Sequence, residues 1–304
     1  MSTATDTLDR RDAIDVAAVV IMLVLTFSWG LNGVAAKLSN TGFNPVFLTI
    51  ARSAVGGVLV YLWCRWRGVR LFEADGTLPA GVLVGLLFGT EFICIFGGLE
   101  YTSVARSALM VNTMPFWVLL GAHFVLGERM SVMKLAGLAL AFCGVVLVFS
   151  DKLSLPSPAA IIGDVMSLGG GMFWAATTLV IKRSRLAVAS AERTLLYQLS
   201  VSAVMTLPML LVAGPVFRDV SFVPIAALLF QAVYVVAVTY VLWFWLMRRY
   251  PAAGLSSFAF LTPVFGVLCG GLLLDEPLSI RIFLALALIG AGLIIVNRPQ
   301  RQKA

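Results

Sequence analysis

The chain has 304 residues, of which 60% are hydrophobic and only 12% are charged, and its mean hydropathy is +0.98. A water-soluble domain is usually about 45–50% apolar and about 25% charged, so this composition excludes a soluble protein and indicates a polytopic membrane protein. The formal net charge of +7 would suit a nucleic-acid binder. However, the basic residues lie in short loops between apolar segments, so we attribute the charge to membrane topology and expect no nucleic-acid partner.

Polar turns divide the chain into ten apolar segments. Most reach the roughly 20 residues that a helix needs to cross the hydrocarbon core. Their apolarity is continuous, whereas the strands of a membrane barrel alternate, so we predict an all-α membrane protein with ten transmembrane helices. The segments cover residues 14–37, 45–64, 78–99, 104–126, 132–149, 160–181, 194–213, 222–247, 252–274 and 280–297.

The 22 lysines and arginines are divided unequally between the two membrane faces. If the N-terminus lies inside, sixteen face the cytoplasm, five lie on the opposite side, and Arg52 remains within the second segment. The positive-inside rule then places both termini in the cytoplasm, with residues 1–13 and 298–304 as cytoplasmic tails.

Two stretches of the sequence repeat each other at an offset of 148 residues without a gap. Matched positions include Ala105 and Ala253, Pro115 and Pro263, Glu128 and Glu276, and Gly144 and Gly292. Because each half holds an odd number of crossings, the second copy enters the membrane from the other side. We therefore predict two inverted five-helix repeats, residues 14–149 and 160–297, joined by a periplasmic linker at residues 150–159. Transporters built in this way carry their substrate site near the membrane midplane, where the repeats meet.

Side chains for catalysis or metal binding are scarce. Cys64, Cys94, Cys143 and Cys269 lie in apolar segments without a CxxC pattern, and His123 is the only histidine. The sequence has no GxSxG or HExxH motif and no nucleotide-binding loop. We therefore expect no catalytic residue, no metal site and no cofactor, and an intramembrane enzyme is a remote alternative.

Glu91 lies in the middle of the third segment, where an acidic side chain is costly unless it is paired, protonated or facing water. One interpretation is a cavity residue that binds a substrate ammonium group or takes up a proton to couple transport. The alternative is a neutral acid hydrogen-bonded between helices, or a pair with Arg52. For Arg52 itself we favour a structural role, because long basic side chains lock helices together.

Pro115 and Pro263 occupy matched positions in the middle of the fourth and ninth segments. Each removes a backbone donor and frees the carbonyl four residues earlier, at Val111 and Ala259. Membrane helices tolerate this where a neighbouring helix or a water-lined cavity satisfies the freed group. We therefore predict that both prolines border a central substrate cavity.

Trp29 and Trp174 correspond to each other at an offset of 145 residues. The inversion is expected to place Trp29 toward the outer side and Trp174 toward the inner side, so that they close the cavity from opposite sides. Aromatic walls with a few polar groups suit an amphipathic organic molecule. The predicted cavity residues are Trp29, Asn32, Glu91, Asn112, Pro115, Trp174, Thr178, Tyr234, Phe260 and Pro263.

Glu128 and Glu276 end matched segments, and Ser131 and Ser279 follow three residues later, immediately before the next segment. Serine at such a position caps the following helix, and an acid beside a turn is satisfied by helix-terminal hydrogen bonds. We interpret these residues as structural and not as a symmetric catalytic pair.

Three stretches mark the chain's family: SWGLNGVAAK in the first segment, LEYTSVARSALMVNTMPFWVLLGAHFVLGE, and the matching AAGLSSFAFLTPVFGVLCGGLLLDE, which has DE where the first copy has GE. With these markers, residues 14–297 resemble the EamA-type, ten-helix exporters of the drug/metabolite transporter superfamily. The resemblance implies export of amino acids or related small metabolites across a bacterial inner membrane, by alternating access. Within the family, the expected pocket most resembles that of the YddG-like aromatic amino acid exporters, although aromatic side chains in a pocket do not establish aromatic substrates.

The resemblance also implies the partners of the chain, namely a small-molecule substrate and the lipid bilayer, with a monomer as the working unit. A nucleotide-sugar or sugar-phosphate carrier of the same superfamily is the nearest alternative. Such a carrier would need lysines or arginines in the cavity to bind phosphate, and only Arg52 is embedded.

Overall fold

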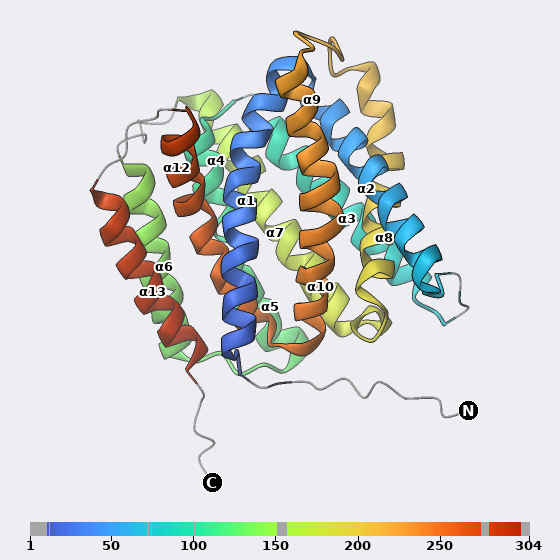
Figure 1. The fold of residues 1–304 in the computed structure, drawn as a ribbon. Coiled ribbons are helices and arrows are strands. Elements are labelled where there is room, and N and C mark those ends of the chain that lie inside the picture. Colours follow the sequence, from blue (N-terminus) through green and yellow to red (C-terminus); the bar gives the residue numbers. More distant parts are fainter. Residues whose placement is uncertain are drawn as a thin grey trace.

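The computed structural model describes residues 11, 13–71, 73, 75–99, 101–150, 157–274 and 280–298, and these residues form a bundle of helices (Figure 1). Within this described part of the chain, nine spans are long and apolar enough to cross a membrane, and a further helix, Arg281–Asn297, is apolar and has 17 residues. The prediction of an all-α membrane protein is therefore confirmed. Most of the predicted linker and both tails, together with Glu276 and Ser279, lie outside the described residues.

Six of the ten spans are single α-helices, and four combine α-helix with other helical forms. The single helices are α1 (Val16–Gly42), α2 (Pro45–Arg67), α3 (Leu78–Leu99), α6 (Val132–Phe149), α7 (Pro158–Arg183) and α13 (Arg281–Asn297). The fourth span comprises α4 (Val104–Val111), α5 (Met114–Gly121) and the π-helix η1 (Ala122–Leu126). The seventh comprises α8 (Ala191–Thr206) and the 3₁₀ helix η4 (Leu207–Leu211), after a short η3 (Arg185–Ala187). The eighth span comprises α9 (Phe222–Leu229), the π-helix η5 (Phe230–Thr239) and α10 (Tyr240–Arg249). The ninth span comprises α11 (Ala252–Ser257), the 3₁₀ helix η6 (Phe258–Phe260) and α12 (Leu261–Leu274).

Polar residues start and end these helices as capping chemistry requires. The N-cap Ser131 accepts a hydrogen bond from the Lys134 amide (3.2 Å), so the predicted cap of α6 is confirmed. A carboxylate oxygen of Glu128 accepts a hydrogen bond from the amide of Ala252 (3.1 Å), at the start of α11. Glu128 therefore satisfies a helix N-terminus, as the structural interpretation of this acid required.

The packing between the two halves is symmetric under their exchange. Helix α3 packs along α7, and the eighth span, which is the counterpart of α3, packs along α1, the counterpart of α7. Likewise, α4 and α5 pack on α7, and α12 of the equivalent ninth span packs on α1. Two further pairs, α6 with α13 and α2 with α8, join equivalent spans of the two halves (Figure 1), and α3 also packs on α8 as η5 packs on α2. With five crossings in each half, equivalent helices would run in opposite directions, as an inverted repeat requires.

The contact between α3 and α7 is close enough to require glycine. A Cβ atom added to Gly163 would lie 2.5 Å from the carbonyl oxygen of Gly98, and one added to Gly98 would lie 2.8 Å from the carbonyl of Gly163. Small residues allow helix backbones to approach in this way, and van der Waals contact then holds them together in lipid. Farther along the same interface the carbonyl of Glu91 lies beside Gly170.

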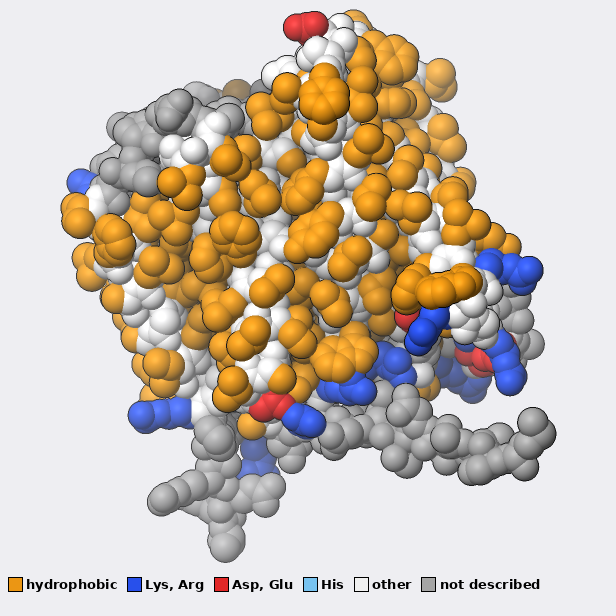
Figure 2. All heavy atoms as spheres, in the orientation of Figure 1, with side chains coloured by type: hydrophobic (Ala, Val, Ile, Leu, Met, Phe, Trp, Pro, Cys, Tyr) orange, Lys and Arg blue, Asp and Glu red, His pale blue; other side chains and the backbone are white. Residues whose placement is uncertain are grey.

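The surface agrees with a membrane environment. Figure 2 shows hydrophobic side chains over the lateral face of the bundle, while lysines and arginines gather at one end. Figure 1 shows that α1 begins and α13 ends at this same end.

Candidate functional site

Trp29 of α1 and Trp174 of α7 meet in the interior of the bundle, with ring centroids 6.3 Å apart and an interplanar angle of 71°. That the two rings close a cavity from opposite sides stays a prediction, and in this conformation they contact each other. Trp29 also makes edge-to-face contacts with Tyr240 (6.4 Å) and Trp243 (5.5 Å) of α10.

The cluster continues onto α3. The rings of Phe88 and Tyr240 lie 6.3 Å apart, and those of Phe88 and Phe92 lie 4.9 Å apart. Four spans thus contribute rings to one group, which we call the central aromatic cluster. Its members are Trp29, Phe88, Phe92, Trp174, Tyr240 and Trp243.

The π-helix η5 positions one polar partner of this cluster. The Thr239 hydroxyl, at its end, accepts a hydrogen bond from the indole nitrogen of Trp29 (3.0 Å) and donates one to the Val235 carbonyl (2.6 Å). π-helical turns shift the register of the side chains that follow and recur at functional sites. The sequence analysis did not identify Thr239. It also left Tyr240 and Trp243 out of the predicted cavity, because α10 contains several aromatic residues and the sequence does not show which of them face inward.

Arg52 and Glu91 are both buried beside this cluster, with 4% and 6% of their surfaces exposed. The Arg52 guanidinium lies over the ring of Phe92 (4.5 Å from Cζ to the centroid) and donates a hydrogen bond to the Tyr240 hydroxyl (3.0 Å). Among the described residues no ion pair joins Arg52 to Glu91. The predicted structural pair is therefore not formed, and the Oε2 atom of Glu91 is buried without a hydrogen-bond partner.

The two matched prolines coincide with breaks in their spans. Helix α4 ends at Val111 and α5 begins at Met114, so Pro115 lies in the first turn of a new helix; Pro263 similarly follows the 3₁₀ turn η6. The carbonyl of Val111 faces α7, since a Cβ atom on Gly171 would lie 2.8 Å from it. The predicted break is present in both repeats, and in the first repeat the backbone of a neighbouring helix approaches the freed carbonyl.

Two predicted polar cavity residues bond to their own helices. The amide nitrogen of Asn112 donates to the Ala108 carbonyl (2.8 Å), and the Thr178 hydroxyl donates to the Trp174 carbonyl (3.2 Å). Asn32 differs, because its Oδ1 atom is buried without a hydrogen-bond partner.

Two predicted aromatic residues lie outside the central aromatic cluster. Tyr234 is 36% exposed, stacks on Phe230, and shares a hydrogen bond with Ser28 (2.9 Å between the hydroxyl oxygens). Phe260 is fully buried between Phe116 and Phe142, with both ring centroids 6.2 Å away. A cavity role for these two residues stays a prediction.

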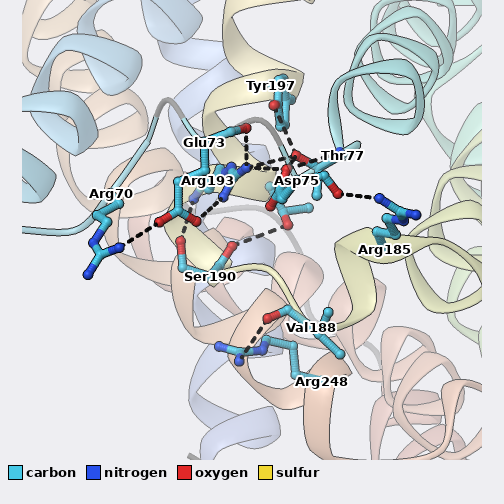
Figure 3. Close-up of polar contacts among 11 residues, drawn as sticks. Arg70, Glu73, Asp75, Thr77, Arg185, Val188, Ser190, Arg193, Tyr197 and Arg248 are labelled. Atoms are coloured by element: carbon cyan, nitrogen blue, oxygen red, sulfur yellow. Dashed lines mark hydrogen bonds and ion pairs between the residues drawn. The ribbon is translucent and has the colours of Figure 1, made fainter. Parts of the chain in front are cut away.

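A polar network joins the two halves at the end of the bundle where α1 begins (Figure 3). Arg193 of α8 is almost fully buried and pairs with Asp75 (2.6 Å) and Glu73 (3.4 Å) from the segment between α2 and α3. It also donates to the Thr77 hydroxyl (2.9 Å), while Arg185 donates to the Asp75 carbonyl (2.7 Å). We call Glu73, Asp75, Thr77 and Arg193 the ionic latch. It borders a cavity of about 390 Å³ between this segment and the α7–α8 connection.

Hydrogen bonds from the Thr77 hydroxyl and amide (2.7 and 3.1 Å) hold the pKa of the Asp75 carboxyl below its usual range, and Arg193 adds to this effect. The Asp75 carboxylate is therefore ionised at neutral pH. The pKa of Asp75 is lower in the folded state than in the unfolded state. The ionised carboxylate therefore stabilises the folded state at pH values above its unfolded-state pKa. This contribution is lost as pH falls through the folded-state pKa.

The inversion relates the ionic latch to a contact of different chemistry at the opposite end. The ionic latch joins the α2–α3 segment to the α7–α8 connection. At the opposite end, the equivalent parts of the chain are the segment between η4 and α9 and the α1–α2 connection. The amide of Asn44 donates to the Val216 carbonyl (2.9 Å), and Phe43 forms a β-bridge with Phe217. The rings of Phe43, Phe47 and Phe217 lie within 5.4–6.2 Å of one another. We call these three residues the aromatic latch.

The EamA-like transporter family matches this chain twice, over residues 16–150 and 161–298. The uncharacterized transporter YvbV of Bacillus subtilis is 28% identical over 94% of this chain and 93% of its own length. A probable amino-acid metabolite efflux pump of Escherichia coli K12 is 25% identical over 91% of this chain and 93% of its own. A protein of known crystal structure has the same fold, with a TM-score of 0.80 at 19% identity over 92% of this chain and 96% of that one. The chain belongs to the EamA-like transporter family and is a multi-pass membrane transporter.

Proposed function

We propose that this protein is a secondary exporter of amino acids or related small amphipathic metabolites, including aromatic ones, and that its substrate binds at the central aromatic cluster. The observation that carries the proposal is the meeting of the two inverted repeats at Trp29 and Trp174, beside buried polar atoms that lack protein partners. Substrate sites of inverted-repeat transporters lie where the repeats meet. The name of the Escherichia coli relative, a probable amino-acid metabolite efflux pump, supports this substrate class.

The substrate would be lined by the predicted cavity residues named above, with Glu91 as the candidate for coupling to protons. The two repeats, residues 14–149 and 160–297, would act as the moving units, and one chain would suffice for transport. The ionic and aromatic latches each join one half to the other at opposite ends of the bundle. Opening them in turn would expose the central site first to one side and then to the other.

A transport screen in proteoliposomes tests this function. Purified protein should exchange or release at least one labelled amino acid faster than protein-free liposomes, and an imposed pH gradient should change the rate if Glu91 couples transport to protons. Absence of transport for all amino acids, with transport of another metabolite class, would refute the amino-acid proposal.

We place the chain in a bacterial inner membrane with both termini in the cytoplasm, because the basic side chains gather at the end where α1 begins. Single cysteines at Ser157 and Arg129, in a chain whose four native cysteines are replaced, measure this orientation. A membrane-impermeant maleimide added to intact cells is expected to label position 157 and not position 129. The reverse pattern would show that the orientation is inverted.

Arg193→Met is expected to open the ionic latch and to increase labelling of a cysteine at Thr178 from the cytoplasmic side about threefold or more. The buried guanidinium supplies the ion pairs with Asp75 and Glu73, and its loss shifts the population toward conformations open on that side. Arg70→Met is the control, because Arg70 is exposed and, of the described residues, is ion-paired with Glu73 at 3.4 Å. Equal labelling in the two variants would contradict a gating role for the latch.

A further inference from the structure

Two buried side-chain oxygens without hydrogen-bond partners belong to helices that contribute rings to the central aromatic cluster. Asn32 is one helical turn beyond Trp29 on α1, and Gly170, which contacts the Glu91 carbonyl, is one turn before Trp174 on α7. As the first and sixth spans, α1 and α7 run in opposite directions. The turn after Trp29 and the turn before Trp174 therefore both lie on the same side of the tryptophan pair along the membrane normal. Oδ1 of Asn32 and Oε2 of Glu91 are the unpartnered atoms.

Unsatisfied buried acceptors are uncommon in folded proteins, because each has lost its water without gaining a protein donor. Here one acceptor belongs to a carboxyl group and the other to an amide, on helices from different parts of the first repeat. An ammonium group offers three donors and a positive charge, so it suits an unpartnered carboxyl oxygen and an unpartnered amide oxygen alike.

Arg52 provides a buried positive charge at the central aromatic cluster. The guanidinium of Arg52 is held by the face of the Phe92 ring and by the Tyr240 hydroxyl, and no carboxylate of the described residues lies within ion-pair distance of it. Phe92, on which the guanidinium lies, directly follows Glu91 in the chain. Both protein contacts leave guanidinium donors for a further acceptor, since arginine carries five N–H groups in a planar fork.

We propose that Arg52, Glu91 and Asn32 recognise the zwitterionic head group of an α-amino acid. Arg52 binds the carboxylate, Glu91 and Asn32 accept the ammonium, and the side chain of the substrate packs against the rings of Trp29 and Trp174. This inference rests on the proposed export of amino acids and adds the residues that select for both charges. It also replaces the structural role that the sequence favoured for Arg52.

The test uses the amino acid that the proteoliposome screen finds to be carried fastest, together with its decarboxylated amine and its deaminated acid. For phenylalanine these are phenethylamine and 3-phenylpropionate. The wild type is expected to be inhibited about tenfold more strongly by the amino acid than by either analogue, because each analogue leaves one buried charged group without its partner. Arg52→Gln should remove the preference over the amine and keep the preference over the acid. Asn32→Leu and Glu91→Gln should weaken the preference over the acid and keep the preference over the amine.

Arg67→Gln is the matched control, because Arg67 lies on the same helix and stacks over an aromatic ring, Trp63, but is exposed. It is expected to leave both preferences unchanged. If Arg52→Gln reduces recognition of all three compounds by the same factor, Arg52 is structural and the inference is wrong, although the protein still exports amino acids. If the wild type carries no amino acid at all, the proposed function fails first, and the inference fails with it. Elution of each variant as a monodisperse species in size-exclusion chromatography separates these outcomes from misfolding. Arg52→Lys keeps the positive charge and should retain part of the preference for the amino acid over the amine.

Discussion

Asp164→Ala is expected to lower the free energy of unfolding by about 3–5 kcal/mol, because it leaves Arg106 buried without the carboxylate that pairs with it. The two side chains are only 11% and 14% exposed. Asp164 accepts hydrogen bonds from the Nε atom of Arg106 (3.2 Å) and from the Thr102 hydroxyl (2.7 Å), and its second oxygen pairs with the Arg106 terminal nitrogen. The pair ties the start of α4 to α7, next to the contact between Gly98 and Gly163.

Denaturant or thermal unfolding in detergent measures this loss. Asp219→Ala is the control and is expected to change the free energy of unfolding by less than about 0.5 kcal/mol, since Asp219 is exposed and its hydrogen bond within the described part of the chain comes from its backbone amide, to Thr41. The double variant Arg106→Met/Asp164→Leu should recover most of the loss, because removing both charges leaves no uncompensated buried ion. Equal destabilisation in the single and double variants would mean that helix packing, and not the ion pair, sets the stability there.

Hydropathy predicted ten spans; the described residues have nine helical spans long and apolar enough to cross a membrane and a tenth apolar helix of 17 residues, and not all of the ends were predicted. The predicted segment 194–213 starts three residues later than α8, because Ser190 caps the helix at Ala191 and Arg193 is retained inside it by its pairs with Asp75 and Glu73. Helix α1 likewise runs to Gly42, past the apolar end at residue 37. The hydroxyls of Ser39 and Thr41 donate to carbonyls of the preceding turn, so polar residues extend this helix without interrupting it.

Repeat symmetry predicted which residues of the centre are equivalent, but not how they meet. The matched prolines coincide with matched breaks, and Trp29 and Trp174 are indeed paired by the inversion. Their direct contact depends on the angle at which the spans cross, which a linear sequence does not contain. The partner of Arg52 was missed for a similar reason: Tyr240 lies 188 residues away, on the face of α10 that η5 turns toward the cluster.

The ionic latch was also beyond sequence reasoning. The segment Glu73–Thr77 is polar and lies between two apolar spans, which is typical of any solvated loop. Only the fold brings it to Arg193, and the inversion then shows that the opposite end of the bundle has a contact of aromatic rings in the equivalent place.

Trp29→Ala is expected to reduce transport by tenfold or more, the largest effect that we predict for a single side chain at the site. Trp29 contacts rings on two other spans and donates to Thr239, so its removal takes away the surface on which both repeats meet. Tenfold corresponds to about 1.4 kcal/mol, which is less than the usual cost of truncating a packed tryptophan. Trp66→Ala is the control, because Trp66 is 75% exposed and, among the described rings, contacts Trp63.

Two further variants separate packing from hydrogen bonding at this position. Trp29→Phe keeps a ring in the cluster and removes the indole donor, and Thr239→Val removes the acceptor while keeping the shape of the side chain. If the hydrogen bond orients Trp29 for the substrate, both variants should lower transport by a similar factor, and combining them should add little, because either change already breaks the same contact. If the ring alone matters, Trp29→Phe should transport nearly as fast as the wild type, and Thr239→Val should be silent. Wild-type rates in Trp29→Ala itself would show that the substrate passes elsewhere, since no pathway through the contact of the two repeats could tolerate the loss of its largest side chain.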